Sequence, residues 1–511
     1  MDKVALLELG LTSIRLTLCM VKDGAYYTTY KQISEQIAID EHIANDSLIN
    51  STKIKECVTI LQMYKKICES EGVSRYLAVA CETLTWAKNY QSFVDECGTA
   101  IGLDFKILTS QDEVNAIYTA VTNTLDTPKG IIVNITGNSV RVIHYNRRIV
   151  LDSATFDLGS SSLFRKVGED GDVVTKGIEF FRDQLTKKAP FLATLDPEAT
   201  IVGVGDVFTS YGRLARKISK SGLEMEHNYT TDSDMFNRVF EFLKTLDPEK
   251  RQKLKGISDQ PVSNILAGLA IISAILEYTR VQNIVVGKSY RNVGLMFNYA
   301  LPHTLERPIA DILGFSLDSV IDTVGLNKKL SEQMYQVGLM LFKQLKVLHK
   351  LPRGYAKVLR IAAHLYQIGR KLNAINPERG NFHAIMLSPI MGCTHKDIVL
   401  AAFVASVKRW EDFDLAQWLR YKDIMTEDDL DAVRKLSNIL AISEALNIRN
   451  QEIVKDISCD ILGDSVILKL ITETDTKNIK VDPYAAYIEI YYAKKYCGEF
   501  NKSFKKNLEI L

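Results

Sequence analysis

Two hairpin-like segments carry the residues of this sequence that are best suited to hold an anion. Ser13 and Arg15 follow the turn of the first segment, and Ser139 and Arg141 follow the turn of the second. Turn amides and Ser or Thr hydroxyls bind phosphate oxygens without bulky side chains in the way, and a guanidinium neutralises the charge of those oxygens. We therefore expect two small-residue turns that enclose a shared site for a phosphate chain.

The two segments also match position for position when they are laid over each other. The matched pairs, first segment then second, are Glu8 with Asn134, Ser13 with Ser139, Arg15 with Arg141 and Leu16 with Val142. Each segment reads as strand, turn and strand, and alternating helices and strands follow it. This repetition predicts that one α/β domain plan is duplicated in the N-terminal half. Two unrelated hairpins with similar turn residues are the alternative.

Two Gly-bearing strand ends, 201–206 and 285–291, extend the predicted phosphate site. Each leads into a helix, and the first amides of a helix can bind an anion. The further candidates for phosphate binding are Leu11, Thr12, Gly137, Asn138, Gly203, Gly205 and Arg291. Turns of this kind are also common as plain structure. The order of these turns within one duplicated domain plan favours phosphate binding over a purely structural role.

The bulk composition describes a globular chain of several domains. One hydrophobic core stops growing near roughly 250–300 residues, and this chain has 511. Its net charge of +1 excludes a global polycation of the histone type, so any polyanion site must be local and no nucleic-acid partner is expected. The eight cysteines form no CxxC pair and indicate a reducing compartment, hence the cytoplasm. No run reaches the ~18 apolar residues of a membrane span, so no membrane partner is expected.

The C-terminal half predicts mostly helices. Strand signals vanish after about residue 305, and apolar residues at helical spacing favour helices at 316–323, 329–350, 354–374, 395–409 and 427–447. In the tail, 464–475 alternates as a strand does. The segment 485–500 fits either a strand or a helix. We expect a small α/β domain there.

Several segments resemble, in order along the chain, the motifs of the exopolyphosphatase/guanosine pentaphosphate phosphatase (Ppx/GppA) family. LELGLTSIRL is similar to D-x-G-S-N-S-x-R/H-L, and VNITGNSVRV to D-I-G-G-G-S-T-E-L. ILTSQDEVNAIYTAV is similar to I-S-G-x-E-E-A-R-L-I-Y-x-G-V, ACETLTWAKNYQSFV to A-T-x-x-L-R-x-A-x-N-x-x-x-F, and SYRNVGLMF to the L-R-E-G-L-L segment. The resemblance implies an actin-like (ribonuclease H-like) pair of domains at 1–125 and 126–304. It also implies a helical HD-like domain, degenerate here, at 305–449 and a small α/β domain at 450–511.

The resemblance further implies stepwise removal of a terminal phosphate from polyphosphate or pppGpp, with a divalent cation and a Glu that positions the attacking water. Glu113 takes the place of that Glu. A carboxylate at the start of a helix beside an interdomain cleft can orient or deprotonate water. Alternatively, Ser110 through Glu113 reads as a capping box with Ser110 as the N-cap, which would make Glu113 structural. Both readings stay open.

The departures from the family pattern fall on residues of the predicted chemistry. Glu8 replaces an Asp and is the one remaining candidate ligand for Mg²⁺, Asn134 replaces a second Asp, and Arg141 replaces a Glu. An amide is a poorer ligand for Mg²⁺ than a carboxylate, whereas arginine contacts phosphate directly. Thr85 stands where the family has an arginine. The sequence therefore predicts a poor magnesium site.

Three functions follow from these departures. The first is a weak exopolyphosphatase or pppGpp phosphohydrolase, and the second is a catalytically inactive regulatory protein that binds polyphosphate or a nucleotide. The third, an ATP-dependent kinase, is disfavoured because nothing resembles a sugar-binding insert and Asn134 is not a carboxylate.

The helical half also departs from its counterpart in the family. Tyr366 and Gln367 stand in place of a His-Asp pair, and only His383 remains of a second cluster. Tyrosine is protonated at neutral pH and glutamine is a weak ligand, so we expect no metal here. We expect His364 and His383 to serve packing or to lie on the surface. The apolar helices 329–350 and 354–374 would permit a homodimer.

A positive stretch in this half has no counterpart in the resemblance. No Asp or Glu occurs from Gln333 through Pro377. The residues that we name the polyanion strip are Lys343, Lys346, Lys350, Arg353 and Lys357. On helices at this spacing several of them share a face and can guide a polyanion. The alternative is a solvated face balanced by acidic neighbours.

Overall fold

The computed structural model describes residues 2–22, 26–39, 43, 47–147, 149–168, 170–254, 262–288, 291–300, 308–371, 373, 375, 377–472 and 486–511. Contacts divide the chain into two compact units. Unit 1 comprises residues 1–220 and 224–312, and unit 2 comprises 221–223 and 313–511. The predicted boundary between residues 304 and 305 lies outside the described residues, and the finer division into four domains stays a prediction.

The first sheet of unit 1 has the strand order β3-β2-β1-β4-β5. Its strands are β1 (Asp2–Leu9), β2 (Ser13–Lys22), β3 (Tyr26–Gln36), β4 (Arg75–Ala80) and β5 (Lys106–Ile107). β1, β2 and β3 pair antiparallel as a meander, whose first two strands are the predicted hairpin, and β1 pairs parallel with β4. The helices are α2 (Ser51–Glu71), η1 (Glu82–Trp86), α3 (Tyr90–Ile101) and α4 (Ser110–Thr122).

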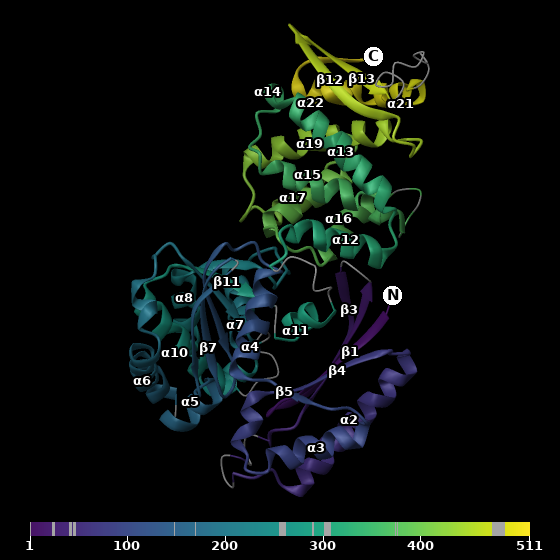
Figure 1. Ribbon diagram of the computed structural model, residues 1–511. Coiled ribbons are helices and arrows are strands. Elements are labelled where there is room, and N and C mark those ends of the chain that lie inside the picture. Colours follow the sequence, from purple (N-terminus) through teal and green to yellow (C-terminus); the bar gives the residue numbers. More distant parts are fainter. Residues whose placement is uncertain are drawn as a thin grey trace. The chain divides into compact units, whose positions relative to one another are not determined.

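Alternate residues of β1 lie in different cores. Ala5, Leu7 and Leu9 pack with α2 and α3, whereas Val4 and Leu6 pack with Met296 of α11. Successive side chains of a strand point to opposite faces, so Glu8 shares the face of Val4 and Leu6. Figure 1 shows α2 and α3 on one side of this sheet and α11 on the other.

The second sheet repeats this plan with one strand more. Its order is β10-β11-β9-β6-β7-β8, built from β6 (Lys129–Ile135), β7 (Val140–Asn146), β8 (Ile149–Phe156), β9 (Thr200–Val204), β10 (Tyr229–Asp232) and β11 (Asn283–Gly287). β6, β7 and β8 form an antiparallel meander, and β6 pairs parallel with β9, just as β1 pairs with β4. The duplicated domain plan is therefore present in the structure.

Helices cover both faces of the second sheet (Figure 1). The helices that follow β8 in unit 1 are α5 (Ser160–Val167), α6 (Asp170–Lys188), η2 (Pro190–Thr194), α7 (Asp206–Ser219), α8 (Ser233–Lys244), α9 (Pro248–Gln252), α10 (Val262–Thr279) and α11 (Arg291–Ala300), of which α11 packs on the first sheet. The large core between the sheet and α6, α7, α8 and α10 takes Val140 and Val142 of β7. The other face takes Ile143 and Tyr145 together with Val114 and Ile117 of α4.

Helices α4 and α11 pack closely against each other. A Cβ at Gly294 would lie 1.7 Å from the carbonyl oxygen of Ala116, so only glycine allows this approach. Because α4 packs on the second sheet and α11 on the first, their contact joins the two halves of unit 1. The first residue of α11 and the first turn of α4 belong to the site described below.

Unit 2 begins with a bundle of helices. They are α12 (Ile312–Val324), α13 (Lys328–Gln344), α14 (Lys346–His349), α15 (Tyr355–Leu365), η3 (Ile368–Lys371), α16 (Pro377–Leu387), α17 (His395–Ser406), η4 (Trp410–Asp412), α18 (Leu415–Leu419) and α19 (Glu427–Leu446). α13, α15, α17 and α19 pack on one another. A sheet of order β12-β13-β14 follows, with β12 (Val454–Leu462), β13 (Ser465–Thr472) and β14 (Asn507–Ile510), and with α21 (Tyr487–Ala493), η5 (Lys494–Tyr496) and α22 (Cys497–Phe504).

The structure changes the predicted helix bounds in three places. The helix predicted at 329–350 is interrupted at Leu345, and Lys350 then ends α14 with a φ of 58°. The helix predicted at 354–374 ends at Leu365 and gives way to the short η3. α16 was not predicted. The segment 485–500, open between strand and helix, is helical from Tyr487 onward.

The described residues contain no helix with the length and apolar character needed to cross a bilayer.

Candidate functional site

The two hairpins have the same register. Glu8 pairs with Arg15 across β1 and β2, and Asn134 pairs with Arg141 across β6 and β7. Their turns close with equivalent hydrogen bonds, from Gly10 N to the Ser13 carbonyl (3.0 Å) and from Thr136 N to the Ser139 carbonyl (2.9 Å). The residue-by-residue match read from the sequence is therefore also a structural match.

Strand alternation directs the key side chains toward α4 and α11. Arg141 shares the face of Ile143 and Tyr145, which pack on α4, and Glu8 shares the face that packs on α11. Both residues are buried, with 2% of Arg141 and 4% of Glu8 exposed. Charged groups are rarely so deeply buried without a partner, so their partners identify the site.

The first turn of α4 corrects the capping prediction. Ser110 is not the N-cap: Thr109 is, and its side chain accepts a hydrogen bond from the amide of Asp112, whose carboxylate accepts one from the amide of Thr109. The hydrogen bond from the Thr109 amide is the main reason why the pKa of Asp112 lies below its ordinary value. Because Asp112 completes the capping box, Glu113 has no role in the cap.

Glu113 instead joins an ion cluster, although only 3% of it is exposed. Arg291 Nη1 donates to Glu113 Oε1 at 2.7 Å, and Arg291 Nη2 lies 3.1 Å from Glu8 Oε1. Arg141 Nη2 forms an ion pair with Glu113 Oε2. Both oxygens of Glu113 are thus held by guanidinium groups. We name Glu8, Glu82, Glu113, Arg141 and Arg291 the ion cluster.

Glu82 and Ser139 complete the contacts of Arg141. Arg141 Nη2 lies 3.5 Å from Glu82 Oε2, and Arg141 Nη1 donates to Ser139 Oγ at 2.9 Å. The backbone amide of Glu82 also donates to Glu113 Oε1 (3.4 Å). Arg141 Nε is a buried donor without an acceptor among the described residues, and Glu8 Oε2 is a buried acceptor without a donor there. These two buried atoms of the ion cluster therefore have hydrogen-bonding capacity that the described residues do not use.

The electrostatics of the cluster favour the charged form of Arg291. Burial works against the charge of Arg291, but the carboxylates of Glu113 and Glu8 outweigh it, so the pKa of Arg291 lies above its ordinary value. Three carboxylates face two guanidiniums here. Removal of one partner would leave a buried charge unpaired, which typically costs about 3–5 kcal/mol.

The second turn is fixed by the start of α5. The amides of Ser160 and Ser161 donate to the carbonyls of Thr136 and Gly137 at 3.0 and 2.8 Å. A Cβ at Gly159 would lie 2.2 Å from the Thr136 carbonyl oxygen, so this approach requires glycine. Arg165 of α5 donates to Asn138 Oδ1 at 2.7 Å and places another cation beside the turn.

The two glycines of the β9 end have different surroundings. Gly205 has a φ of 102° and is the N-cap of α7, and a Cβ there would lie 3.4 Å from Asn134 Nδ2, so it adjoins the second hairpin. At Gly203 a Cβ would lie 2.0 Å from the Phe208 ring, which makes this glycine a packing requirement.

In the first turn, the carbonyls of Leu11 and Thr12 accept hydrogen bonds from the amides of Ile39 and Ile37. Leu11 is buried and Thr12 is exposed. Residues 289 and 290, before Arg291, lie outside the described residues.

The ion cluster does not suit Mg²⁺. Glu8 Oε1 and both oxygens of Glu113 are occupied by arginines, and the position of a second carboxylate is the amide of Asn134. Mg²⁺ requires oxygen ligands, and a guanidinium beside the ion would repel it. Among the described residues, no three His, Cys, Asp or Glu side chains are grouped as a metal would need.

Unit 2 has a group of charged side chains beside Tyr366, consisting of Lys408, Glu378 and Glu444, which we name the Lys408 cluster. Lys408 Nζ lies 2.7 Å from Glu378 Oε1 and 3.0 Å from Glu444 Oε2, and Tyr366 Oη donates to the same oxygen of Glu444 (2.8 Å). Burial, with Glu444 next, raises the pKa of Tyr366 well above its ordinary value. A lysine ammonium thus supplies the positive charge at this position.

The histidines of unit 2 contact neighbouring side chains. His364 Nε2 lies 3.2 Å from Glu332 Oε2, and the His383 ring lies edge-on to Phe382.

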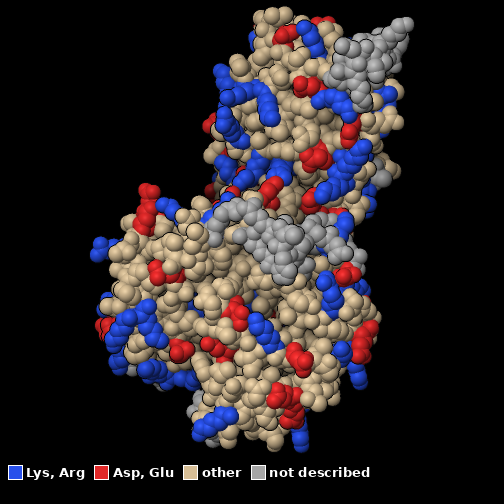
Figure 2. All heavy atoms as spheres, in the orientation of Figure 1, with Lys and Arg blue, Asp and Glu red and all other residues tan. Residues whose placement is uncertain are grey.

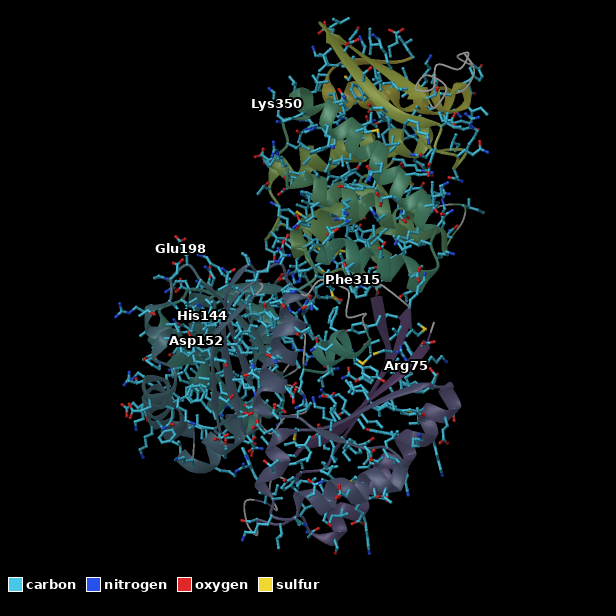
Figure 3. All side chains as sticks on the ribbon, viewed as in Figure 1. Arg75, His144, Asp152, Glu198, Phe315 and Lys350 are labelled. Carbon is cyan, nitrogen blue, oxygen red and sulfur yellow. The ribbon has the colours of Figure 1, made fainter. Side chains whose placement is uncertain are left out.

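The polyanion strip lies on exposed parts of unit 2. Lys343, Lys346, Lys350 and Arg353 are exposed, and none forms an ion pair with a carboxylate of the described residues. Lys357 is half-buried and donates to the Gly392 carbonyl (3.4 Å). Figure 2 shows Lys and Arg side chains gathered where Figure 1 labels α14, and Figure 3 labels Lys350 there.

Sequence reasoning missed three parts of the site in unit 1. Glu82 lies at a position that the matched family segment leaves unspecified, and Arg165 and the Gly159–Ser162 stretch follow a strand that carried no site residue. The run of small residues from Gly159 to Ser162, just before a helix, was the signal that could have drawn attention to α5.

Comparison with known proteins places this chain among phosphatases. The model of the Ppx/GppA phosphatase family matches residues 20–296, more than half of the chain. Exopolyphosphatase 1 of Mycobacterium leprae (strain TN) is 19% identical over 289 residues, 55% of this chain and 85% of the relative. Guanosine-5'-triphosphate,3'-diphosphate pyrophosphatase of Aeromonas salmonicida (strain A449) is 18% identical over 379 residues, 71% of this chain and 72% of the relative.

Solved structures agree on the fold. The type II variant of the Aquifex aeolicus Ppx/GppA phosphatase is 22% identical and superposes with a TM-score of 0.50 over 59% of this chain and 100% of its own. An exopolyphosphatase from Cytophaga hutchinsonii is 15% identical, with a TM-score of 0.53 over 58% of this chain and 98% of its own. These likenesses show the actin-like fold of such enzymes. Together with the match of the family model, they lead to one conclusion: the chain belongs to the Ppx/GppA phosphatase family.

Proposed function

We propose that this chain binds the phosphate chain of polyphosphate or of a guanosine polyphosphate at the ion cluster, and that it hydrolyses the terminal phosphate slowly. The substrate class comes from the relatives, whose names are exopolyphosphatase and guanosine-5'-triphosphate,3'-diphosphate pyrophosphatase. The observation that carries the proposal is that Glu113 forms ion pairs with both Arg141 and Arg291.

Binding is supported by the two arginines. Guanidinium groups make paired, charge-assisted hydrogen bonds to phosphate oxygens as they do to carboxylates. Arg141 and Arg291 come from β7 and α11 and converge beside the second turn, where Arg165 adds a further cation. A phosphate group can therefore replace a carboxylate as the partner of these arginines.

Slow hydrolysis is supported by the state of Glu113. Both oxygens of this carboxylate are engaged by guanidinium groups, so an attacking water must compete with Arg141 and Arg291 for them. The substitutions at positions 134 and 141 also remove carboxylates that the family pattern supplies. Loss of such transition-state stabilisation costs roughly 10²–10⁴ in rate.

Phosphate release from polyphosphate and from pppGpp, measured with Mg²⁺ present, tests this proposal. We expect a kcat below ~1 s⁻¹ for the wild-type chain and a further decrease for Glu113→Gln. A wild-type kcat above that value would falsify slow hydrolysis. Equal rates near zero for both proteins, with retained binding, would favour the alternative of a catalytically inactive binding protein.

A further inference from the structure

We propose that Arg141 and Arg291 take the place of a divalent cation in this site, so that the chain binds its phosphate ligand without metal. This inference rests on the proposed function, because it concerns the same ligand at the same place. It starts from the disagreement between the metal that the family implies and the side chains that are present.

The two arginines match a divalent cation in charge. Arg141 and Arg291 together carry two positive charges, the same as one divalent cation, and they meet at Glu113. One of them stands where the family pattern has a carboxylate, so a single substitution removes a metal ligand and adds a cation. Guanidinium groups keep their charge in proteins, and the carboxylates of Glu113 and Glu8 raise the pKa of Arg291 above its ordinary value although burial opposes it.

The carboxylates of the ion cluster leave few oxygen atoms that could bind a metal ion. Glu113 has no free oxygen, and Glu8 retains only Oε2. An ion bound to that oxygen would lie beside Arg291, which contacts the other oxygen of the same carboxylate at 3.1 Å. Repulsion between the ion and the guanidinium opposes such binding. Metal and arginines therefore exclude each other.

The ion cluster also offers hydrogen-bond donors that suit a phosphate chain. Arg141 Nε is a buried donor without an acceptor among the described residues, and a phosphate oxygen is an acceptor that fits it. Glu113 and Glu8 hold the arginine side chains in place before a ligand binds. A phosphate chain then exchanges with these carboxylates at the guanidiniums. Mg²⁺ in solution binds the phosphate chain and competes with this exchange.

Titration of the full-length chain with sodium polyphosphate, followed by calorimetry, tests the inference. One arm contains EDTA and the other contains Mg²⁺. We expect the affinity in EDTA to equal or exceed that in Mg²⁺. A Kd more than roughly tenfold weaker in EDTA overturns the inference and leaves the proposed function intact. Absence of binding in both arms overturns both.

Variants assign the binding to the two arginines. Arg291→Gln is expected to weaken binding in EDTA at least roughly tenfold, because one charge-assisted pair is lost. Arg141→Gln leaves Glu113 with an unpaired buried charge, so Arg141→Gln/Glu113→Gln, which removes both partners, is measured beside it. Arg147→Gln, which removes a partly exposed arginine paired with Asp126, is the matched control and should bind as the wild type does. Unchanged affinity in Arg291→Gln and in the paired variant contradicts the inference.

Discussion

At the scale of single residues, the two hairpins differ in charge at one of two equivalent positions. Glu8 and Asn134 are structural equivalents of different charge, whereas Arg15 and Arg141 are structural equivalents of the same residue type, so the register is preserved. Arg141 sits within reach of Glu113 because strand alternation directs it toward α4. A carboxylate at the same position would face Glu113 directly and would need a cation between them.

We predict that Asn134→Asp/Arg141→Glu makes the stability of the chain depend on Mg²⁺. The cluster then contains five carboxylates and one guanidinium in place of three and two, and their mutual repulsion destabilises the fold in EDTA. A bound ion stabilises the native state by about 2.7 kcal/mol at a concentration of 100 times its Kd. Thermal denaturation in EDTA and in Mg²⁺ measures this effect.

The wild-type chain is the control for this variant, and its midpoint should be the same in both buffers. A midpoint of the double variant that does not rise with Mg²⁺ argues against a metal site that can be restored by these two positions alone.

At the scale of elements, the fold was readable from the sequence wherever the information was local. Two short apolar runs, 4–9 and 14–21, on either side of a Gly-bearing turn predicted the β1–β2 hairpin, and the matching turns predicted its copy in β6 and β7. The alternation of side chains along these strands also assigns Glu8 and Arg141 to a face of their sheets, because residues two apart share a face.

Parts of the site that depend on distant or alternative contacts were not readable. Arg291 reaches Glu113 across 178 positions, through the packing of α11 on α4, and no local pattern encodes that contact. The cap of α4 was misassigned because Thr109 and Ser110 are both good N-caps, and only the extended backbone of Thr109 decides between them. Likewise, the break at Leu345 lies within a continuous apolar periodicity.

We predict that the Lys408 cluster stabilises the helices of unit 2. Lys408 joins Glu378 of α16 and Glu444 of α19, and its side chain is 27% exposed. Lys408→Met removes the cation that pairs with both glutamates. We therefore expect the free energy of unfolding to fall by about 2 kcal/mol, which is less than the cost of breaking a fully buried pair. Urea denaturation measures this loss.

Lys343→Met is the matched control, because Lys343 is exposed and has no ion-pair partner among the described residues. Its change should stay within about 0.5 kcal/mol. Equal stability of the two variants would mean that the Lys408 cluster contributes nothing beyond an ordinary surface lysine.

At the scale of the whole molecule, the chain has a net charge of only +1 and presents its candidate phosphate-binding cations in two different settings. In unit 1 the two guanidiniums are buried or half-buried beside three carboxylates, whereas in unit 2 four residues of the polyanion strip, Lys343, Lys346, Lys350 and Arg353, are exposed and form no ion pair among the described residues. Buried pairs act through specific contacts, and exposed charges act through a field that salt screens. The two places should therefore respond differently to the length of a ligand.

We predict that Lys346→Glu/Lys350→Glu/Arg353→Glu weakens the binding of long polyphosphate and leaves the binding of tripolyphosphate unchanged. A short ligand is held by the ion cluster alone, whereas a long chain that also contacts the strip gains from a second attachment within one complex. We expect a loss of roughly tenfold for the long chain at low salt, which shrinks as the salt concentration rises. Fluorescence anisotropy with end-labelled chains measures both affinities.

A triple variant with the same affinity as the wild type for long chains removes the strip from ligand binding, and an equal loss for both ligands would show that the substitutions act on unit 1 through the fold.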